Sequence, residues 1–277
     1  MGTTTLANVV TMRPGTPIRA IGRARLIAAA SGLAVAFLSG CAEQPDEARQ
    51  IVDAAIDYQG GEFLDRTRIS FDLRGRHYRV TRDRGRFTYE RIYTDSTGNN
   101  IHDILNNDGL YRERNGERVE LDSAQHRSAL VGVNSTVYFA LLPYPLQDPA
   151  VRTQYLGTAA VGDANYHEIE VTFVPEGGGL DYEDRFVYWI GTDVPVVDYL
   201  AYYYFTEGGG SRFRRAVNKR RVGGILFSDY ENYAAPRDSN FTDIHVYDAL
   251  FEQDSLSLVS TIDLENIRVF DLDDEGW

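Results

Sequence analysis

Short segments in which apolar and polar residues alternate follow one another along most of this chain, and this alternation limits the fold more than any other feature. In 68–74, for example, Ile69, Phe71 and Leu73 occupy every second position between polar residues. A period of two is the pattern of a β-strand with one buried face. Because such segments come in consecutive runs and do not alternate regularly with helices, the pattern excludes a doubly wound α/β fold and predicts antiparallel strands.

Strands are expected in both halves of the chain. In the first half the alternating segments are 68–74, 77–81, 86–93 and 111–121. In the second half they are 153–160, 166–174, 185–190, 195–205, 211–221, 224–233 and 256–269. Asn115-Gly116 is a strong hairpin signal, because both residues accept the positive φ of a type I′ turn. The last segment is long enough that we expect a bend within it.

Two segments interrupt the alternation and predict helices. Residues 46–58 carry apolar side chains at helical spacing and are followed by a pair of glycines, which commonly end helices. Residues 123–142 (SAQHRSALVGVNSTVYFALL) predict one or two helices stopped by Pro143 and Pro145. The expected fold is mainly β (α+β): a large, strongly curved antiparallel sheet with an N-terminal helix, and with 131–142 as a helical plug on the concave face.

The N-terminus has the layout of a secretory signal. Residues 1–25 contain four arginines and no acid, and 26–38 are almost entirely apolar. That apolar run is too short for a comfortable transmembrane helix. The next residues, Leu38-Ser39-Gly40-Cys41, resemble the bacterial lipobox, and Cys41 is the single cysteine of the chain. This resemblance implies signal cleavage after Gly40 and acylation of Cys41. An ordinary secretory signal with an incidental cysteine is the alternative.

An acylated Cys41 would make the protein a lipoprotein of the cell envelope. We expect a signal peptide at 1–40, a lipidated tether at 41–47 and one β-rich domain at 48–277. Two or three acyl chains would give stable membrane attachment, whereas one chain binds only marginally. Because Ala42, and not aspartate, follows the cysteine, we expect the outer membrane, with the protein facing the periplasm. The inner membrane stays open as an alternative.

The charge balance excludes some partners. The chain has 28 Lys and Arg against 41 Asp and Glu, a formal net charge of −13. An acidic chain is unsuited to neutralising nucleic-acid phosphates or to forming a polybasic membrane surface. The one basic cluster comprises Arg212, Arg214, Arg215, Lys219, Arg220 and Arg221. On a strand, Arg212 and Arg214 would share a face, where they would meet an acidic headgroup or carboxylate or pair with acids on neighbouring strands.

Signals for catalysis and metal binding are weak. The five histidines form no pair at ligand spacing, and there is no GxSxG motif. Residues 176–184 hold four carboxylates beside glycines, but their spacing fits no established calcium loop, and a solvated hairpin loop explains them equally well. We therefore expect no metal, no cofactor and no identified catalytic residue. A carboxylate-dependent hydrolase stays open, because only geometry reveals a catalytic carboxylate pair.

The order of the expected elements resembles a known fold. A helix, antiparallel strands, an internal helical plug and further strands resemble the half-barrel of bacterial lipoprotein carriers and lipid-binding lipoproteins of the LolA, LolB and LppX type. The stretches EGGGLDYEDRFVYWI, YLAYYYF and FSDYENY are similar to an uncharacterised family of bacterial envelope lipoproteins. This resemblance implies binding of a lipid or another apolar ligand, and it offers no catalytic residues to transfer.

The candidate ligand-lining residues come from the helical plug and two aromatic-rich strands. They are Tyr138, Phe139, Leu142, Trp189, Tyr199, Tyr203 and Phe205. Because 198–205 is apolar on both faces, a central strand buried on both sides is the alternative interpretation. The leading hypothesis is a lipid-anchored envelope protein that binds an apolar or amphipathic ligand, such as a lipid or lipoprotein acyl chains, in the sheet's concavity. A non-enzymatic protein-interaction or assembly lipoprotein is the alternative, followed by the hydrolase.

Overall fold

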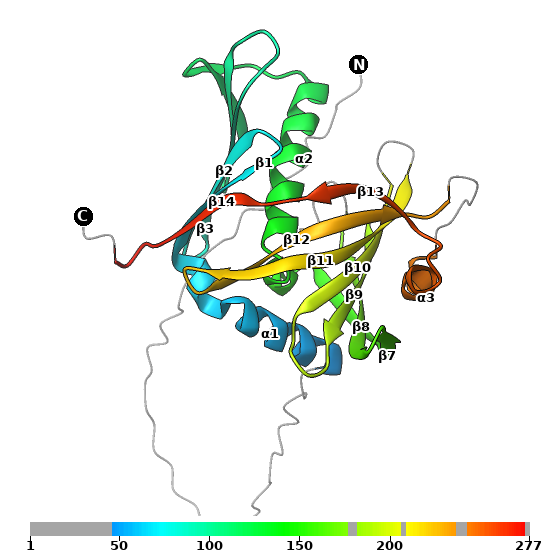
Figure 1. Ribbon diagram of the computed structural model, residues 1–277. Coiled ribbons are helices and arrows are strands. Elements are labelled where there is room, and N and C mark those ends of the chain that lie inside the picture. Colours follow the sequence, from blue (N-terminus) through cyan, green and yellow to red (C-terminus); the bar gives the residue numbers. More distant parts are fainter. Residues whose placement is uncertain (1–45, 177–181, 206–208, 237–242, 275–277) are drawn as a thin grey trace, which may run out of the picture.

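The computed structural model describes residues 46–176, 182–205, 209–236 and 243–274. Its strands form two seven-stranded antiparallel sheets (Figure 1). The first sheet, in the order β14-β1-β2-β3-β4-β5-β6, contains β1 (Thr67–Leu73), β2 (Arg76–Asp83), β3 (Arg86–Thr94), β4 (Asn100–Asn106), β5 (Gly109–Arg114), β6 (Glu117–Val119) and β14 (Glu265–Asp271).

The second sheet has the order β13-β12-β11-β10-β9-β8-β7. It contains β7 (Val151–Val161), β8 (Ala164–Phe173), β9 (Arg185–Gly191), β10 (Val197–Tyr204), β11 (Gly210–Val222), β12 (Ile225–Ala234) and β13 (Ser257–Ile262). The helices are α1 (Glu47–Gln59), α2 (Ser123–Ala140) and α3 (Tyr247–Glu252), with short 3-10 turns η1 (Gly61–Arg66), η2 (Tyr144–Gln147) and η5 (Ile244–Val246). Among the helices that the structure describes, none combines the length and hydropathy needed to cross a bilayer.

The two sheets are joined through the last two strands. β13 pairs with β12 in the second sheet, and β14 pairs with β1 in the first. The expected final strand is therefore divided at 263–264, where the chain passes from one sheet to the other. At the opposite ends, β6 and β7 are edge strands that do not pair with each other. The result is a curved, open wall of strands, which confirms the expected half-barrel architecture, with its strands divided between two linked sheets.

Two-residue turns build the first sheet. Asn115 and Gly116 both have positive φ between β5 and β6, so the hairpin predicted there is confirmed. The β1–β2 and β2–β3 turns have the same conformation at Arg74-Gly75 and Arg84-Gly85. The right-handed twist of the flanking strands favours this turn type.

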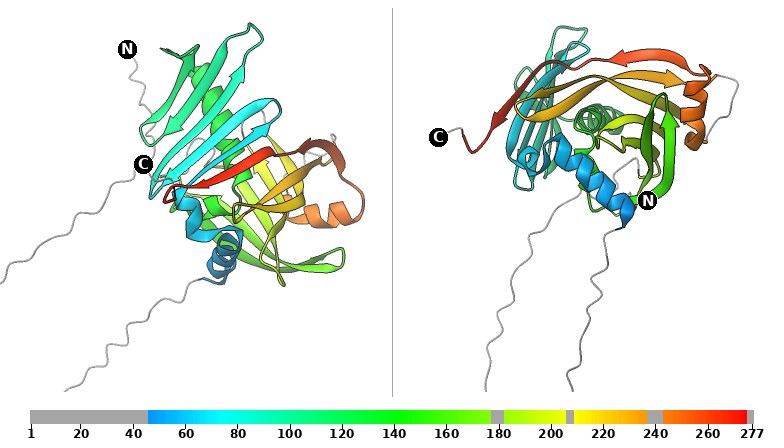
Figure 2. Two further views of the ribbon diagram at one scale, coloured as in Figure 1. Left: turned by 60° about the vertical axis from the view of Figure 1, so that its left-hand side comes forward. Right: turned by 60° about the horizontal axis from the view of Figure 1, so that its bottom comes forward.

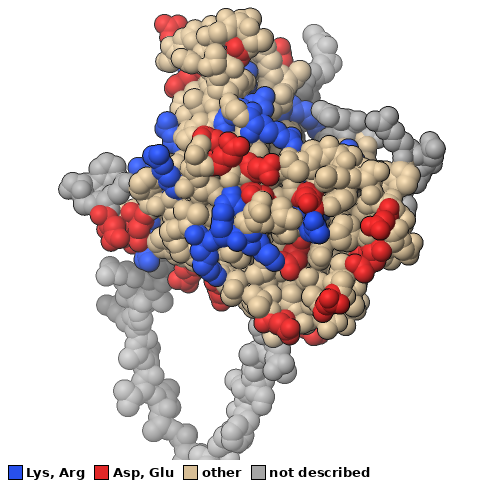
Figure 3. Space-filling view, in the orientation of Figure 1, with Lys and Arg blue, Asp and Glu red and all other residues tan. Residues whose placement is uncertain are grey.

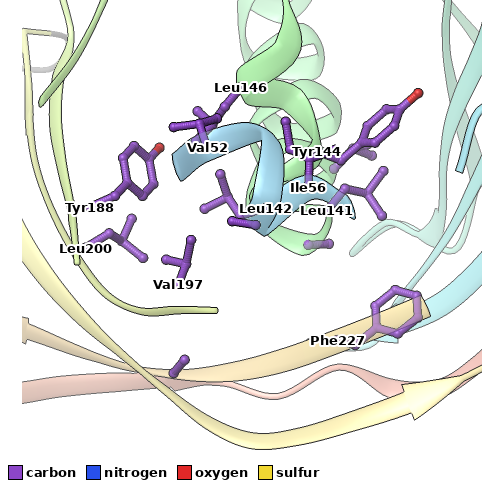
Figure 4. Close-up of a cluster of buried hydrophobic side chains, with 14 of the residues drawn as sticks. Val52, Ile56, Leu141, Leu142, Tyr144, Leu146, Tyr188, Val197, Leu200 and Phe227 are labelled. Atoms are coloured by element: carbon purple, nitrogen blue, oxygen red, sulfur yellow. The ribbon is translucent and has the colours of Figure 1, made fainter. Parts of the chain in front are cut away.

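Helices fill the concave side of the strands, as Figure 2 shows with α2 inside the curve and α1 across its opening. In α1, the buried residues Ala48, Val52, Ala55 and Ile56 share one face, and Asp46 caps the N-terminus by accepting from the backbone N–H of Ala48. Figure 4 shows side chains of α1, of the segment after α2 and of the strands pointing into one space. This first hydrophobic cluster is the main core.

The second sheet is also buried on its other face. There a second cluster, which includes Trp189, Phe213 and Tyr247, lies beneath η5 and α3. The central strand β10 therefore contributes to both clusters, with Leu200 in the first and Ala201 in the second. The interpretation of this segment as a strand buried on both sides agrees with its observed packing.

Candidate functional site

Aromatic side chains connect α2 with the concave face of the second sheet. Tyr138 and Phe139 of α2 lie 5.8 and 6.4 Å from the ring of Phe186, measured between ring centroids. Phe139 also lies 5.4 Å from Tyr202. The hydroxyl oxygens of Tyr138 and Tyr188 are 2.8 Å apart. Burial raises the pKa of Tyr138 and of Tyr188, so both hydroxyls stay protonated near neutral pH and share one hydrogen bond.

Arg214 lies beneath this aromatic contact, on β11. Its side chain is 8% exposed, and its guanidinium carbon lies 3.7 Å from the ring centroid of Phe139 and 5.1 Å from that of Tyr202. Nη2 donates a hydrogen bond to the Tyr202 hydroxyl at 2.9 Å. Nε and Nη1 are buried and have no hydrogen-bond partner among the described residues. Arg214 is thus a buried cation with unused donors.

A neighbouring side chain is also incompletely bonded. Asn232 of β12 lies directly opposite Arg214 in the strand register, so both side chains project from the same face. Its Nδ2 donates to Ser260 Oγ at 3.2 Å, while Oδ1 is buried without a partner. Two adjacent buried groups therefore keep unused hydrogen-bonding capacity, in a setting where native proteins usually satisfy such groups.

Three other basic residues of β11, Arg215, Lys219 and Arg220, pair with acids, whereas Arg212 and Arg221 donate to backbone carbonyls. Arg215 Nε donates to Glu231 Oε2 at 2.9 Å, Lys219 pairs with Asp198, and Arg220 Nη2 donates to Asp229 Oδ1 at 3.0 Å. Figure 3 shows basic side chains interspersed with acidic ones on this side of the molecule. Cross-strand pairing, one of the two interpretations of the basic cluster, thus describes these three residues but not Arg214.

Arg214 also influences the titration of its surroundings. Burial raises the pKa of Tyr230 to about 12, and the positive charge of Arg214 acts in the opposite direction.

The stacking on Phe139 offsets part of the cost of burying Arg214, since a desolvated cation–π contact contributes about 2 kcal/mol. Leaving a buried charge without its partner costs about 3–5 kcal/mol. The contact with Phe139 therefore offsets only part of the free-energy cost of burying Arg214.

The concave side holds very little free space. A hollow of about 10 Å³ lies between the end of α1, the segment after α2 and the second sheet, and Gln59, Pro143 and Tyr230 are among its lining residues. The helical cover, which we define as residues 131–147, packs with α1 against the sheets in the main core. A ligand on this face would therefore have to displace part of the helical cover.

A larger hollow, of about 570 Å³, lies on the opposite face of the first sheet. It is open, and most of the side chains that line it are polar or charged: Arg68, Arg79, Thr81, Thr88, Glu90, His102, Ile104, Tyr111 and Glu113. His102 Nε2 lies 2.8 Å from Glu90 Oε1, and its Nδ1 lies 3.6 Å from Glu113 Oε2. Its charged groups pair with one another across neighbouring strands, so this hollow lacks the apolar lining expected of a lipid site.

A buried ionic cluster lies under the middle of α2, next to Gly132. Asp103 of β4 accepts from Arg91 Nη2 at 2.7 Å and from Arg112 Nε at 2.6 Å. The guanidinium of Arg91 packs against Gly132 so closely that a Cβ there would lie 1.8 Å from Nη1. Among the described residues, the buried carboxylates are Asp103 and Asp229, and each pairs with arginine. This geometry gives the hydrolase hypothesis no support.

The residues expected to line a ligand site do not form one surface. Tyr138, Phe139 and Leu142 lie on the concave side. In contrast, Trp189, Tyr199 and Tyr203 belong to the second cluster, and Phe205, which is 50% exposed, follows the end of β10. On β10 the residues that face α2 are instead Leu200, Tyr202 and Tyr204. A ligand-lining role stays a prediction for the first group.

Several other expected sites lie partly or wholly outside the described residues. Gly40 and Cys41 precede the first described residue, and most of the glycine-rich acidic segment 176–184 is likewise outside. Within the described ranges, no group of three or more His, Cys, Asp or Glu side chains is placed to hold a metal ion. From the sequence, Arg214 was identified only as one of two basic residues on the same face of a strand. No local sequence pattern indicates that it lacks an acidic partner among the described residues.

Comparisons with solved structures find proteins of related architecture. A LolA superfamily protein from Nitrosomonas europaea is 12% identical, with 80% of this chain and 92% of that chain covered and a TM-score of 0.43. A putative outer membrane lipoprotein-sorting protein domain from Vibrio parahaemolyticus is 8% identical (79% and 91% covered, TM-score 0.42). The lipoprotein LppX from Mycobacterium tuberculosis is 13% identical (57% and 87% covered, TM-score 0.27).

Sequence comparison places the chain in a family. No curated protein matches it in sequence. A model of one protein family, described as a family of unknown function (DUF6503), matches residues 32–264 and so covers most of the chain. The chain therefore belongs to this family of unknown function (DUF6503).

Proposed function

We propose that this protein is a lipid-anchored envelope protein that binds an apolar or amphipathic ligand between its helical cover and the concave face of its strands. The observation that carries the proposal is the continuous apolar surface formed by both sheets and closed by helices. On the second sheet, aromatic stacking and the Tyr138–Tyr188 hydrogen bond are prominent contacts of the cover. A ligand could make equivalent contacts with the second sheet in place of the helical cover.

An acyl chain is a suitable replacement for the helical cover. Apolar burial contributes roughly 25 cal/mol per Å² and is non-directional. A chain that inserts where Phe139 and Leu142 now pack would bury comparable surface on the same wall, so the exchange would cost little free energy. The hollow of about 10 Å³ beside Pro143 is the proposed point of entry, because it lies between the helical cover and the second sheet.

Membrane attachment through acylated Cys41 is the second part of the proposal. It is supported by the lipobox-like Leu38-Ser39-Gly40-Cys41 after an apolar segment. The outer membrane, facing the periplasm, is the proposed location. In a bacterial host, the mass of the mature protein would include the acyl groups, and Cys41→Ser would abolish both this added mass and membrane fractionation. Membrane fractionation of the Cys41→Ser variant would contradict anchoring at this residue.

Lipid uptake combined with hydrogen exchange tests the ligand site. The delipidated full chain should take up radiolabelled palmitate or its methyl ester in the absence of detergent, and native mass spectrometry should detect the complex. Peptides from 131–147 should then change their amide exchange, whereas peptides from α3, on the other side of the second sheet, serve as the matched control. Absence of uptake would refute ligand binding. Uptake with changes confined to α3 would move the site to the other face.

A further inference from the structure

We infer that Arg214 binds the head of an amphipathic ligand that carries one negative charge, while the apolar chain of that ligand lies along the concave face. This inference rests on the proposed function, because the ligand must enter beneath the helical cover. It adds a chemical class: a monoanionic headgroup on an apolar chain, supplied either by a long-chain carboxylate or by a phosphodiester lipid.

The hydrogen-bonding state of Arg214 is the first argument. Two of its three guanidinium nitrogens, Nε and Nη1, are buried and unpartnered among the described residues. Carboxylate and phosphodiester oxygens are the acceptors that a guanidinium binds best. Since Arg214 contributes one positive charge, a single negative charge would neutralise it, whereas a dianionic head would leave an uncompensated buried charge.

The surroundings of Arg214 are the second argument. Its immediate neighbours Phe139, Tyr202 and Leu200 are apolar or aromatic and belong to the concave face or pack on it. They would hold an apolar chain next to a charged head. Charge, donors and apolar surface therefore meet at one place.

The contrast along β11 is the third argument. Arg215, adjacent in sequence but on the other face, is paired with Glu231. Among the described residues, the fold thus supplies an acid to the neighbouring cation and none to Arg214. In the ligand-free structure, the ring of Phe139 stacks on Arg214 in place of an anion. Movement of α2 away from the sheet would remove this ring and expose the guanidinium to a headgroup.

The test compares ligands that differ only in headgroup charge. Dissociation constants for palmitate and methyl palmitate are measured with the delipidated full chain and its Arg214→Met and Arg215→Met variants. We expect the wild type to bind palmitate at least tenfold tighter than the ester. Arg214→Met should bind both equally, and Arg215→Met, the matched control on the same strand, should keep the preference. Arg214→Lys should restore part of it.

Each result has a defined meaning. If the wild type binds neither probe, the proposed function itself fails. If it binds both equally, or if Arg214→Met keeps the preference for palmitate, ligand binding stands and the role of Arg214 is refuted. The wild-type comparison alone is decisive if the variant does not fold. Uptake from phosphatidylglycerol vesicles then separates the two sources: uptake by the wild type that Arg214→Met loses identifies a phosphodiester head, and no uptake by a wild type that binds palmitate identifies the carboxylate.

A stability measurement separates ligand binding from a structural role. Because methionine removes a buried, incompletely bonded charge and keeps an apolar side chain, Arg214→Met should melt at the same temperature as the wild type or higher. A structural role for Arg214 would instead lower the melting temperature of the ligand-free variant.

Discussion

Gln59 and Arg214 are both buried polar side chains near the helical cover, and their hydrogen bonds differ. Gln59 Nε2 donates to the carbonyls of Leu141 and Leu142 at 3.0 and 2.9 Å, and its Oε1 accepts from the backbone N–H of Tyr144 at 3.0 Å. Gln59 therefore fastens the segment after α2 to α1. Arg214 has no comparable set of partners, so its position is better explained by a ligand than by folding.

Replacement of Gln59 by methionine should destabilise the protein. Two carbonyls and one N–H would lose their partner in a buried setting, which costs about 3 kcal/mol in total. For a chain of this size the melting temperature should fall by about 6–12 °C. Calorimetry checks this, with Gln154→Met at an exposed position of β7 as the control. Equal melting temperatures for the two variants would contradict the fastening role.

Asp95 provides a pH-dependent test at the turn between β3 and β4. Its carboxylate accepts from the Thr97 hydroxyl at 2.7 Å and from the backbone N–H groups of Asn99 and Thr97, both at 2.9 Å. These hydrogen bonds, with that of the Thr97 hydroxyl the largest cause, lower the pKa of Asp95 to about 2. Because the folded pKa lies below the unfolded value, the stabilisation is complete above the unfolded pKa and is lost as the pH falls through about 2.

A carboxyl titration by carbon-13 NMR measures this value directly. The Asp95 resonance should have its midpoint near 2, and the stability difference between the wild type and Asp95→Asn should narrow as the pH is lowered from 6 towards 2. Thr97→Val removes the hydroxyl donor and should move the midpoint upward. A wild-type midpoint at the ordinary value for aspartate would show that the turn does not hold the carboxylate.

At the scale of elements, α2 has two functional parts. Its middle packs on the Arg91–Asp103–Arg112 cluster of the first sheet, where Gly132 allows the close approach of Arg91. Its C-terminal part carries Tyr138 and Phe139 to the second sheet. In the ionic cluster each arginine pairs with Asp103, whereas the C-terminal part of α2 covers Arg214, which has no acidic partner among the described residues. We therefore expect the C-terminal part to be the one that moves.

Substitution of Gly132 tests the anchored part. Alanine stabilises a helix by about 1 kcal/mol relative to glycine, but its Cβ would displace Arg91 from Asp103. Gly132→Ala should therefore destabilise the wild type by about 1–3 kcal/mol and stabilise an Arg91→Met background. Denaturant unfolding of the four proteins of this double-mutant cycle gives the comparison. A stabilising effect in both backgrounds would show that the contact imposes no constraint.

The same elements show what the sequence could predict. Strands of the second sheet were placed within a few residues, because their alternation is clear, and α2 was bounded by its prolines. β4 was missed because Asp103 points inward to two arginines and breaks the alternation. The six-residue α3 was missed because it is too short to show a helical period. That helix covers Tyr199 and Trp189, so missing it also assigned those residues to the wrong face.

For the whole molecule, the critical feature is the crossing between β13 and β14. The sequence indicated a bend there. The two strands enter different sheets because β13 pairs with β12 and β14 pairs with β1, and both partners are distant in sequence. At the crossing, the backbone N–H of Leu264 donates to Asp229 Oδ1 at 2.8 Å, and Arg220 Nη2 donates to the same oxygen at 3.0 Å. Asp229 therefore fixes the position at which the chain passes from the second sheet to the first.

Replacement of Asp229 by alanine should weaken both sheets together. It would leave the Leu264 N–H without its acceptor and remove one acceptor of Arg220, whose Nη2 also donates to the Leu264 carbonyl, at a cost of about 1–3 kcal/mol. Because both sheets contribute to the main core, unfolding should remain one transition at a lower temperature, and amide exchange should rise in β1 as well as in β12. The exposed neighbouring carboxylate, Asp263→Ala, is the control and should change stability by no more than about 0.5 kcal/mol.

If exchange rises only in β13 and β14, the crossing is a local feature and the two sheets are stabilised independently of it. A rise in both sheets would mean that the open wall behind the proposed ligand site responds as one cooperative unit.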